Sequence, residues 1–127
     1  MKQEAKMGRA RIMIVEDSES TANYLINRLE KLGYHPLPPA GTGEDAVEKI
    51  RELKPDLILM DVELDGKLDG IETAELILKK HDLPVLYLTS HSEDEFLQRA
   101  RITEPYAYLI KPVRERELYA NVEIALC

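Results

Sequence analysis

The sequence is poor in the features that would place it in a disulfide-bonded scaffold, a membrane or a secreted protein. It has one cysteine, Cys127 at the last position, so an internal disulfide is excluded. Its apolar runs, such as residues 57–60 and 85–88, are far shorter than the roughly 20 residues that a membrane helix needs. Residues 1–11 lack the apolar centre of a signal peptide. These absences predict a cytoplasmic protein without a membrane span.

Basic residues are also too few for a nucleic-acid surface. Lys and Arg number 17 against 24 Asp and Glu, which leaves a net charge of −7. Because binding to nucleic acid requires clustered cations that neutralise phosphates, we expect no direct contact with nucleic acid. The length of 127 residues and the 44% apolar content suit one domain with its own core. We expect this domain over residues 11–127, after an N-terminal extension of residues 1–10.

Short apolar segments alternate five times with longer segments of helical period. Strands are expected at residues 12–15, around 34–37, and at 57–60, 85–88 and 107–110. Nearly continuous apolar strands are typical of a parallel sheet covered on both faces. Pro36 cannot donate to a ladder, so the second strand belongs at an edge. The pattern predicts an α/β fold, a flavodoxin-like (βα)5 three-layer sandwich with a five-stranded parallel sheet of order 2-1-3-4-5.

Residues with known capping preferences mark the ends of the predicted helices. These signals are Gly33 after the first helix, Lys54-Pro55 after the second, Asp69 with Glu72 at the start of the third, and Ser92 with Glu95 at the start of the fourth. The last helix is expected from about residue 114, with Leu118, Val122 and Ala125 buried.

Polar side chains follow four of the five predicted strands where each strand ends. They are Glu16-Asp17, Asp61, Thr89-Ser90 and Lys111-Pro112. The carboxyl ends of parallel strands share one edge of the sheet, so these side chains should meet in one crevice. Three adjacent carboxylates repel one another unless a cation lies between them. Carboxylate oxygens without nearby histidine or cysteine favour Mg²⁺, with Mn²⁺ as the alternative, over zinc. Lys111 and Thr89 would complete a site suited to a phosphoryl group.

This ordered set of motifs resembles the receiver domains of response regulators in two-component (histidine-aspartate phosphorelay) signalling systems. The matching motifs are Ile14-Val15-Glu16-Asp17, Asp56-Leu57-Ile58-Leu59-Met60-Asp61, Leu88-Thr89-Ser90 and Leu109-Ile110-Lys111-Pro112, with Asp69-Gly70-Ile71 opening the third helix. Each motif alone is weak evidence, but together they cover nearly the whole chain. The resemblance implies that Asp61 accepts a phosphoryl group from a histidine kinase or a histidine phosphotransfer domain.

The resemblance also implies roles for the neighbouring groups. Thr89 and Lys111 would contact the phosphoryl group, and the Lys111-Pro112 peptide bond would be cis. The metal ligands would be Glu16, Asp17, Asp61 and the backbone carbonyl of Glu63. Such a protein is a phosphoacceptor signalling domain that catalyses only its own phosphorylation and dephosphorylation, and is otherwise not an enzyme.

Tyr108 matches the aromatic position that receivers use as a switch together with Thr89. The implied movement changes the face formed by the fourth helix, the fifth strand and the fifth helix, through which a homodimer could form. No output domain fits after Leu126. The chain is therefore expected to be a free-standing regulator or a module of a hybrid kinase or a longer regulator.

Two other functions use similar residues. A haloacid-dehalogenase-type phosphatase also has an aspartate nucleophile and Mg²⁺, but its nucleophile follows the first strand, its second acid would have to be Glu63, and a cap segment is missing. A degenerate receiver that only binds partners is the second alternative. The retention of all five site groups (Glu16, Asp17, Asp61, Thr89 and Lys111) argues against it.

Overall fold

The computed structural model describes residues 9–90 and 94–127, in which five strands alternate with five helices. In chain order they are β1 (Arg11–Val15), α1 (Glu19–Lys31), β2 (His35–Pro36), α2 (Gly43–Leu53), β3 (Leu57–Asp61), α3 (Gly70–Leu78), β4 (Val85–Thr89), α4 (Asp94–Arg101), β5 (Ala107–Ile110) and α5 (Glu115–Leu126). Most of the expected 1–10 extension lies outside the described residues, as does the expected Ser92 start of the fourth helix. The described helices are all too short or too polar to cross a bilayer.

The strands form one parallel sheet in the order β2-β1-β3-β4-β5, which confirms the predicted fold class and strand order. The edge strand β2 is only two residues long, shorter than the predicted 34–37. Pro36 lacks an N–H, but the chain still lies along β1, because the amide of Leu37 donates to the carbonyl of Ile12 at 2.8 Å. The other edge is β5, which pairs only with β4.

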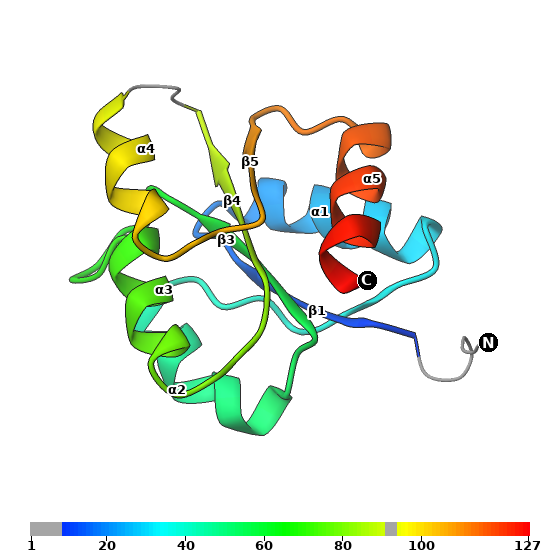
Figure 1. Cartoon of the computed structure of the whole chain (residues 1–127). Helices are drawn as coiled ribbons and strands as arrows, with labels where there is room; N and C mark the ends of the chain where they lie inside the picture. The colour runs from blue at the N-terminus through cyan, green and yellow to red at the C-terminus, as the bar shows by residue number, and fades with distance from the viewer. Residues whose placement is uncertain (1–8, 91–93) are drawn as a thin grey trace.

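Helices cover both faces of the sheet, so the fold has three layers (Figure 1). The side chains of β1 alternate between the two faces: Met13 and Val15 pack with α2 and α3, whereas Ile12 and Ile14 pack with α1 and α5. Every residue of β3 and β4 is buried. Because full burial of a large apolar side chain contributes about 1.5–3 kcal/mol, the apolar residues of these two strands stabilise the sheet strongly.

The predicted helix boundaries in the described residues are confirmed. After α1, Gly33 adopts a φ of 94°, a left-handed conformation that glycine tolerates. Helix α2 ends at Leu53, and Lys54, which precedes proline, leaves the right-handed region with a φ of 49°. Asp69 and Glu72 form a capping box at the start of α3. The four strands whose ends carry the candidate residues are parallel neighbours in the sheet, so these ends lie beside one another.

Candidate functional site

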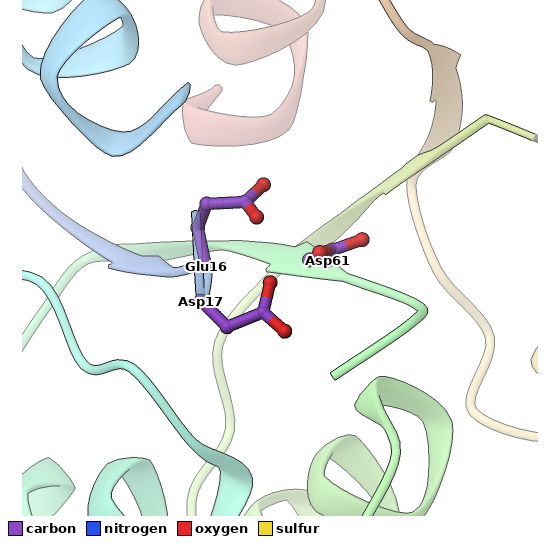
Figure 2. A group of neighbouring side chains, drawn as sticks. All are labelled: Glu16, Asp17 and Asp61. Atoms are coloured by element: carbon purple, nitrogen blue, oxygen red, sulfur yellow. The ribbon is translucent and has the colours of Figure 1, made fainter. Parts of the chain in front are cut away.

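The carboxyl ends of β1 and β3 bring three acidic side chains together. Carboxylate oxygens of Glu16, Asp17 and Asp61 lie within 4.8 Å of one another, and Figure 2 shows the three groups gathered at the ends of the two strands. Glu16 and Asp61 are each only 3% exposed, whereas Asp17 is open to solvent. The predicted convergence of these carboxylates is confirmed.

Lys111 enters the same cluster from the end of β5. Its Nζ lies 2.8 Å from Oε1 of Glu16 and 3.3 Å from Oδ2 of Asp61. Its backbone amide donates to the carbonyl of Thr89 at 2.8 Å, which ties the end of β5 to the end of β4. The Lys111-Pro112 peptide bond is cis, as the resemblance implied. The ammonium group thus lies between two buried carboxylates.

The environment shifts the proton affinity of both partners. Burial and the nearby charge of Glu16 raise the pKa of Asp61 to about 7, against the opposing effect of Lys111 and of the Glu63 amide. Burial disfavours the charged form of Lys111, but its hydrogen bond to Glu16 and the charge of Asp61 outweigh that effect and raise its pKa. Lys111 therefore stays cationic near neutral pH, while Asp61 holds a proton more tightly than an ordinary carboxyl group.

Replacement of Asp61 by asparagine should stabilise the metal-free protein at alkaline pH. The pKa of Asp61 is raised from 3.8 to about 7 in the folded chain, so the folded state binds this proton more tightly than the unfolded state does. The stability associated with the proton is present in acid and is lost as the pH rises through about 7. In EDTA at pH 8, Asp61→Asn should therefore have a higher free energy of unfolding than the wild type, by urea denaturation, and the difference should shrink towards pH 5. A difference between the two proteins that is the same at pH 8 and at pH 5 would contradict the raised pKa of Asp61.

Backbone amides orient each of the three carboxylates. The amide of Ser18 donates to Oε2 of Glu16 at 3.1 Å, that of Glu63 to Oδ1 of Asp61 at 3.2 Å, and that of Asp65 to Oδ2 of Asp17 at 3.1 Å. Two of these donors come from the loop between β3 and α3. That loop therefore helps to shape the acidic cluster, and it brings the predicted metal ligand Glu63 next to Asp61.

Gly70 allows the start of α3 to lie directly against the end of β3. A Cβ atom at this position would lie 1.9 Å from the carbonyl oxygen of Asp61, a distance that excludes any side chain. The amide of Gly70 donates to the carbonyl of Val62 at 2.8 Å. Gly70 thereby closes the loop that carries Glu63 and Asp65.

Thr89 and Tyr108 lie on the neighbouring strands β4 and β5, where Thr89 is paired with Ile110 and Tyr108 with Tyr87. Thr89 ends β4 and is 2% exposed. Tyr108 is half-buried; its ring stacks on Tyr87 with centroids 6.1 Å apart, and its hydroxyl donates to the carbonyl of Leu97 in α4 at 3.4 Å. The structure thus places the two residues that the resemblance linked as a switch on adjacent strands, with Tyr108 in contact with α4.

Sequence reasoning missed Glu44, which lies at the start of α2 and holds the β3–α3 loop. Its two carboxylate oxygens accept from the amides of Lys67 and Leu68, both at 3.3 Å. These bonds lower the pKa of Glu44. A carboxylate in the first turn of a helix is common because it interacts favourably with the helix dipole, so its presence gave no signal of this second contact.

The chemistry of the donor set fits a divalent cation. When all are ionised, three carboxylates and one ammonium group leave an excess of two negative charges in a partly buried cluster. Among the described residues the candidate metal ligands of this cluster are all carboxylates, and such hard oxygen ligands suit Mg²⁺ or Mn²⁺. The open position of Asp17 leaves a path from solvent. The site can therefore hold a metal ion beside the oxygens of Asp61.

Comparison with known proteins identifies relatives over nearly the whole chain. The family described as the response regulator receiver domain matches residues 12–123. The transcriptional regulatory protein PdtaR of Mycobacterium tuberculosis is 36% identical over 116 residues, and AfsQ1 of Streptomyces coelicolor is 32% identical over 115 residues. Each match covers 91% of this chain, but 56% of PdtaR and 50% of AfsQ1, so the chain spans about half the length of these relatives.

Solved structures give the same assignment. The signal receiver domain of a modulated diguanylate cyclase from Desulfovibrio desulfuricans superposes with a TM-score of 0.88 at 39% identity, over 93% of this chain and 94% of that one. The N-terminal domain of a response regulator/sensory box/GGDEF protein from Carboxydothermus hydrogenoformans superposes with a TM-score of 0.84 at 44% identity, over 91% and 93%. The chain therefore belongs to the response regulator receiver domain family of two-component signalling systems.

Proposed function

We propose that Asp61 is the phosphoacceptor of this receiver and takes its phosphoryl group from a histidine kinase or a histidine phosphotransfer domain. The observation that supports this most directly is the position of Asp61: a buried carboxylate at the end of β3, in reach of Glu16, Asp17 and Lys111. Receiver domains are signalling domains and not classical enzymes. The reaction proposed here is accordingly a single transfer per cycle onto the protein itself.

The transfer is a displacement at phosphorus. A carboxylate oxygen of Asp61 attacks the phosphorus of a phosphohistidine, an O–P bond forms, and the P–N bond to the histidine ring breaks. The electron pair of the broken bond stays on the ring nitrogen. Lys111 pairs with one phosphoryl oxygen, and the hydroxyl of Thr89 donates to another. The product is an acyl phosphate on Asp61, which water later hydrolyses.

The proposed metal is Mg²⁺, with Mn²⁺ as a substitute, held by Glu16, Asp17, Asp61 and the backbone carbonyl of Glu63. When bound, the cation supplies positive charge that keeps Asp61 ionised and offsets the charge of the phosphoryl oxygens. The chain's own groups would then orient the reaction. The amide of Glu63 fixes one oxygen of Asp61, and Lys111 lies beside the other.

The phosphatase alternative fits less well. In a haloacid-dehalogenase-type enzyme the nucleophile follows the first strand, whereas Asp61 ends β3 and β1 is followed by Glu16 and Asp17. The degenerate receiver remains weaker because all five proposed site groups are present, and four of them lie in one cluster: Glu16, Asp17, Asp61 and Lys111.

Mapping the modified residue tests the acceptor directly. After incubation of the chain with acetyl phosphate and Mg²⁺, we expect one phosphoryl group per chain by intact mass. Reduction of the acyl phosphate with borohydride, followed by peptide mass spectrometry, should mark Asp61. The same incubation in EDTA should give almost no label, because the carboxyl group is then partly protonated and the phosphoryl charge is not neutralised. A mark on another carboxylate would contradict the assignment.

We further propose that phosphorylation is transmitted through Thr89 and Tyr108 to the face made by α4, β5 and α5, where a homodimer could form. Exposed apolar side chains lie along this region: Ile102 just after α4, Tyr106 just before β5, and Ile110 in β5, the edge strand of the sheet. A rise in mass by sedimentation with a phosphoryl mimic would support the dimer, and an unchanged monomer would exclude it.

The switch itself should be visible in the ring of Tyr108. With beryllofluoride and Mg²⁺, we expect the side-chain NMR signals of Tyr108 to move as the ring changes rotamer and loses its contact with the carbonyl of Leu97. The methyl signals of Ile50, which is buried in α2 and so lies outside the α4, β5 and α5 face, serve as an internal control that should change less. Unchanged Tyr108 signals with a mimic bound would rule out an aromatic switch.

A further inference from the structure

Helix α1 is joined to the segment that follows Lys111 by a hydrogen bond that the proposed chemistry does not use. The hydroxyl of Tyr24 donates to the backbone carbonyl of Val113 at 2.9 Å, across 89 positions of sequence. Val113 lies two residues after Lys111, and its side chain is 5% exposed in the core between the sheet and α1 and α5. Tyr24 therefore holds the backbone close to the lysine that reaches Asp61.

The ring of Tyr24 is itself held in place by Arg28 one turn further along α1. The guanidinium carbon of Arg28 lies 4.7 Å from the ring centroid, and its Nε lies 3.6 Å from Oε1 of Glu115 in the first turn of α5. A cation over an aromatic face is attracted by the negative charge of the ring face. Helix α1 therefore makes two contacts with this region: Tyr24 binds the backbone of Val113, and Arg28 binds the side chain of Glu115 at the start of α5.

The other side of Lys111 is also tied down. Its amide donates to the carbonyl of Thr89 at 2.8 Å, so the backbone on either side of the lysine is fixed, by β4 before Pro112 and by Tyr24 after it. The side chain of Lys111 is a flexible four-carbon stem, and its 2.8 and 3.3 Å contacts with Glu16 and Asp61 depend on where its Cα lies. A small shift of this loop would change both distances.

Tyr24 and Lys111 also line one cavity next to the acidic cluster. The cavity has a volume of about 490 Å³, and Ser20, Ser90 and Pro112 contribute to its wall. Tyr24 and the lysine therefore border the same space, and the hydroxyl of Tyr24 bonds to the backbone of Val113. This placement suits a residue that acts on the reaction through another group.

We propose that Tyr24 is a positioning residue for phosphoryl transfer. Its hydrogen bond to Val113 fixes the backbone of the Lys111-Pro112 loop in the position from which the Lys111 side chain contacts Asp61. The inference rests on the proposed function, because it assigns Lys111 a role in the transfer to Asp61. Helix α1 then contributes to the reaction indirectly, through the hydrogen bond from the Tyr24 hydroxyl to the Val113 carbonyl.

The test is Tyr24→Phe, which removes the hydroxyl, with its bond to Val113 and its interaction with Arg28, and keeps the ring contact with Arg28. At saturating acetyl phosphate and Mg²⁺ we expect the initial rate of labelling to fall about three- to tenfold, the loss that corresponds to one hydrogen bond of ordinary strength. Tyr119→Phe is the matched control, since the described contact of Tyr119 is a ring contact with Tyr34, which the substitution retains. Circular dichroism should show both variants folded. A wild-type rate in Tyr24→Phe would overturn the proposal.

A double-mutant cycle separates positioning from a general effect on the fold. If Tyr24 acts through Lys111, then Tyr24→Phe should lower the rate in the wild-type background but change it little in a Lys111→Ala background. An equal loss in both backgrounds would show that Tyr24 acts independently of the lysine, and would overturn the inference while the proposed function stands. A wild-type chain that takes no label at Asp61 would instead overturn the proposed function and this inference together.

Discussion

Asp61→Asn is expected to abolish labelling by acetyl phosphate and Mg²⁺. Asparagine has nearly the same shape as aspartate but no carboxylate to attack phosphorus, so no acyl phosphate can form at this position, even slowly. Intact mass after a long incubation should show only unmodified chain, whereas the wild-type chain gains one phosphoryl group.

The matched control for this loss is Asp65→Asn in the same loop. The described contact of Asp65 with the site runs through its backbone amide, which the substitution retains, so this variant should label at close to the wild-type rate. Persistent labelling of Asp61→Asn at the wild-type level would move the acceptor to another residue. Loss of labelling in both variants would point to a disturbed loop instead of a missing nucleophile.

The fold could be predicted because its determinants are local. Four strands are short apolar runs, and the two faces of β1 follow from simple alternation of its side chains. The edge position of β2 followed from Pro36. Its length did not, because a ladder depends on which residues of the neighbouring strand come within reach, and here only Arg11 with His35 and Ile12 with Pro36 are paired.

The site could be predicted only as far as strand ends determine it. The rule that parallel strands share one crevice brought Glu16, Asp17, Asp61 and Lys111 together. It said nothing of groups whose partner is a backbone atom. Tyr24 and Glu44 belong to this second kind: each binds a loop whose course depends on the packed tertiary structure, so no spacing in the sequence marks them.

The two kinds of residue contribute differently to the charge balance of the cluster. Glu16 and Asp61 are buried side by side, and burial of like charges is costly unless a counter-ion is near. Among the described residues, Lys111 is the cation that contacts both Glu16 and Asp61. Its loss should therefore affect the reaction more than the loss of any residue that only positions it.

Lys111→Ala is expected to lower the rate of labelling by about 10²–10³-fold, the loss seen when one preorganised donor to a developing charge is removed. Alanine leaves Asp61 in place, so slow labelling should persist, in contrast to Asp61→Asn. Initial rates over a range of acetyl phosphate concentrations would measure the effect, which should fall mainly on the rate at saturation because the ammonium group is needed most in the transition state.

Lys67→Ala gives a matched control for this variant. Lys67 is an exposed lysine in the β3–α3 loop, and its described hydrogen bond to Glu44 is made by its backbone amide. The variant changes the net charge of the chain by the same amount as Lys111→Ala, so it should label at close to the wild-type rate. A Lys111→Ala rate within a few-fold of this control would mean that the ammonium group neutralises buried carboxylates in the resting protein without taking part in the transfer.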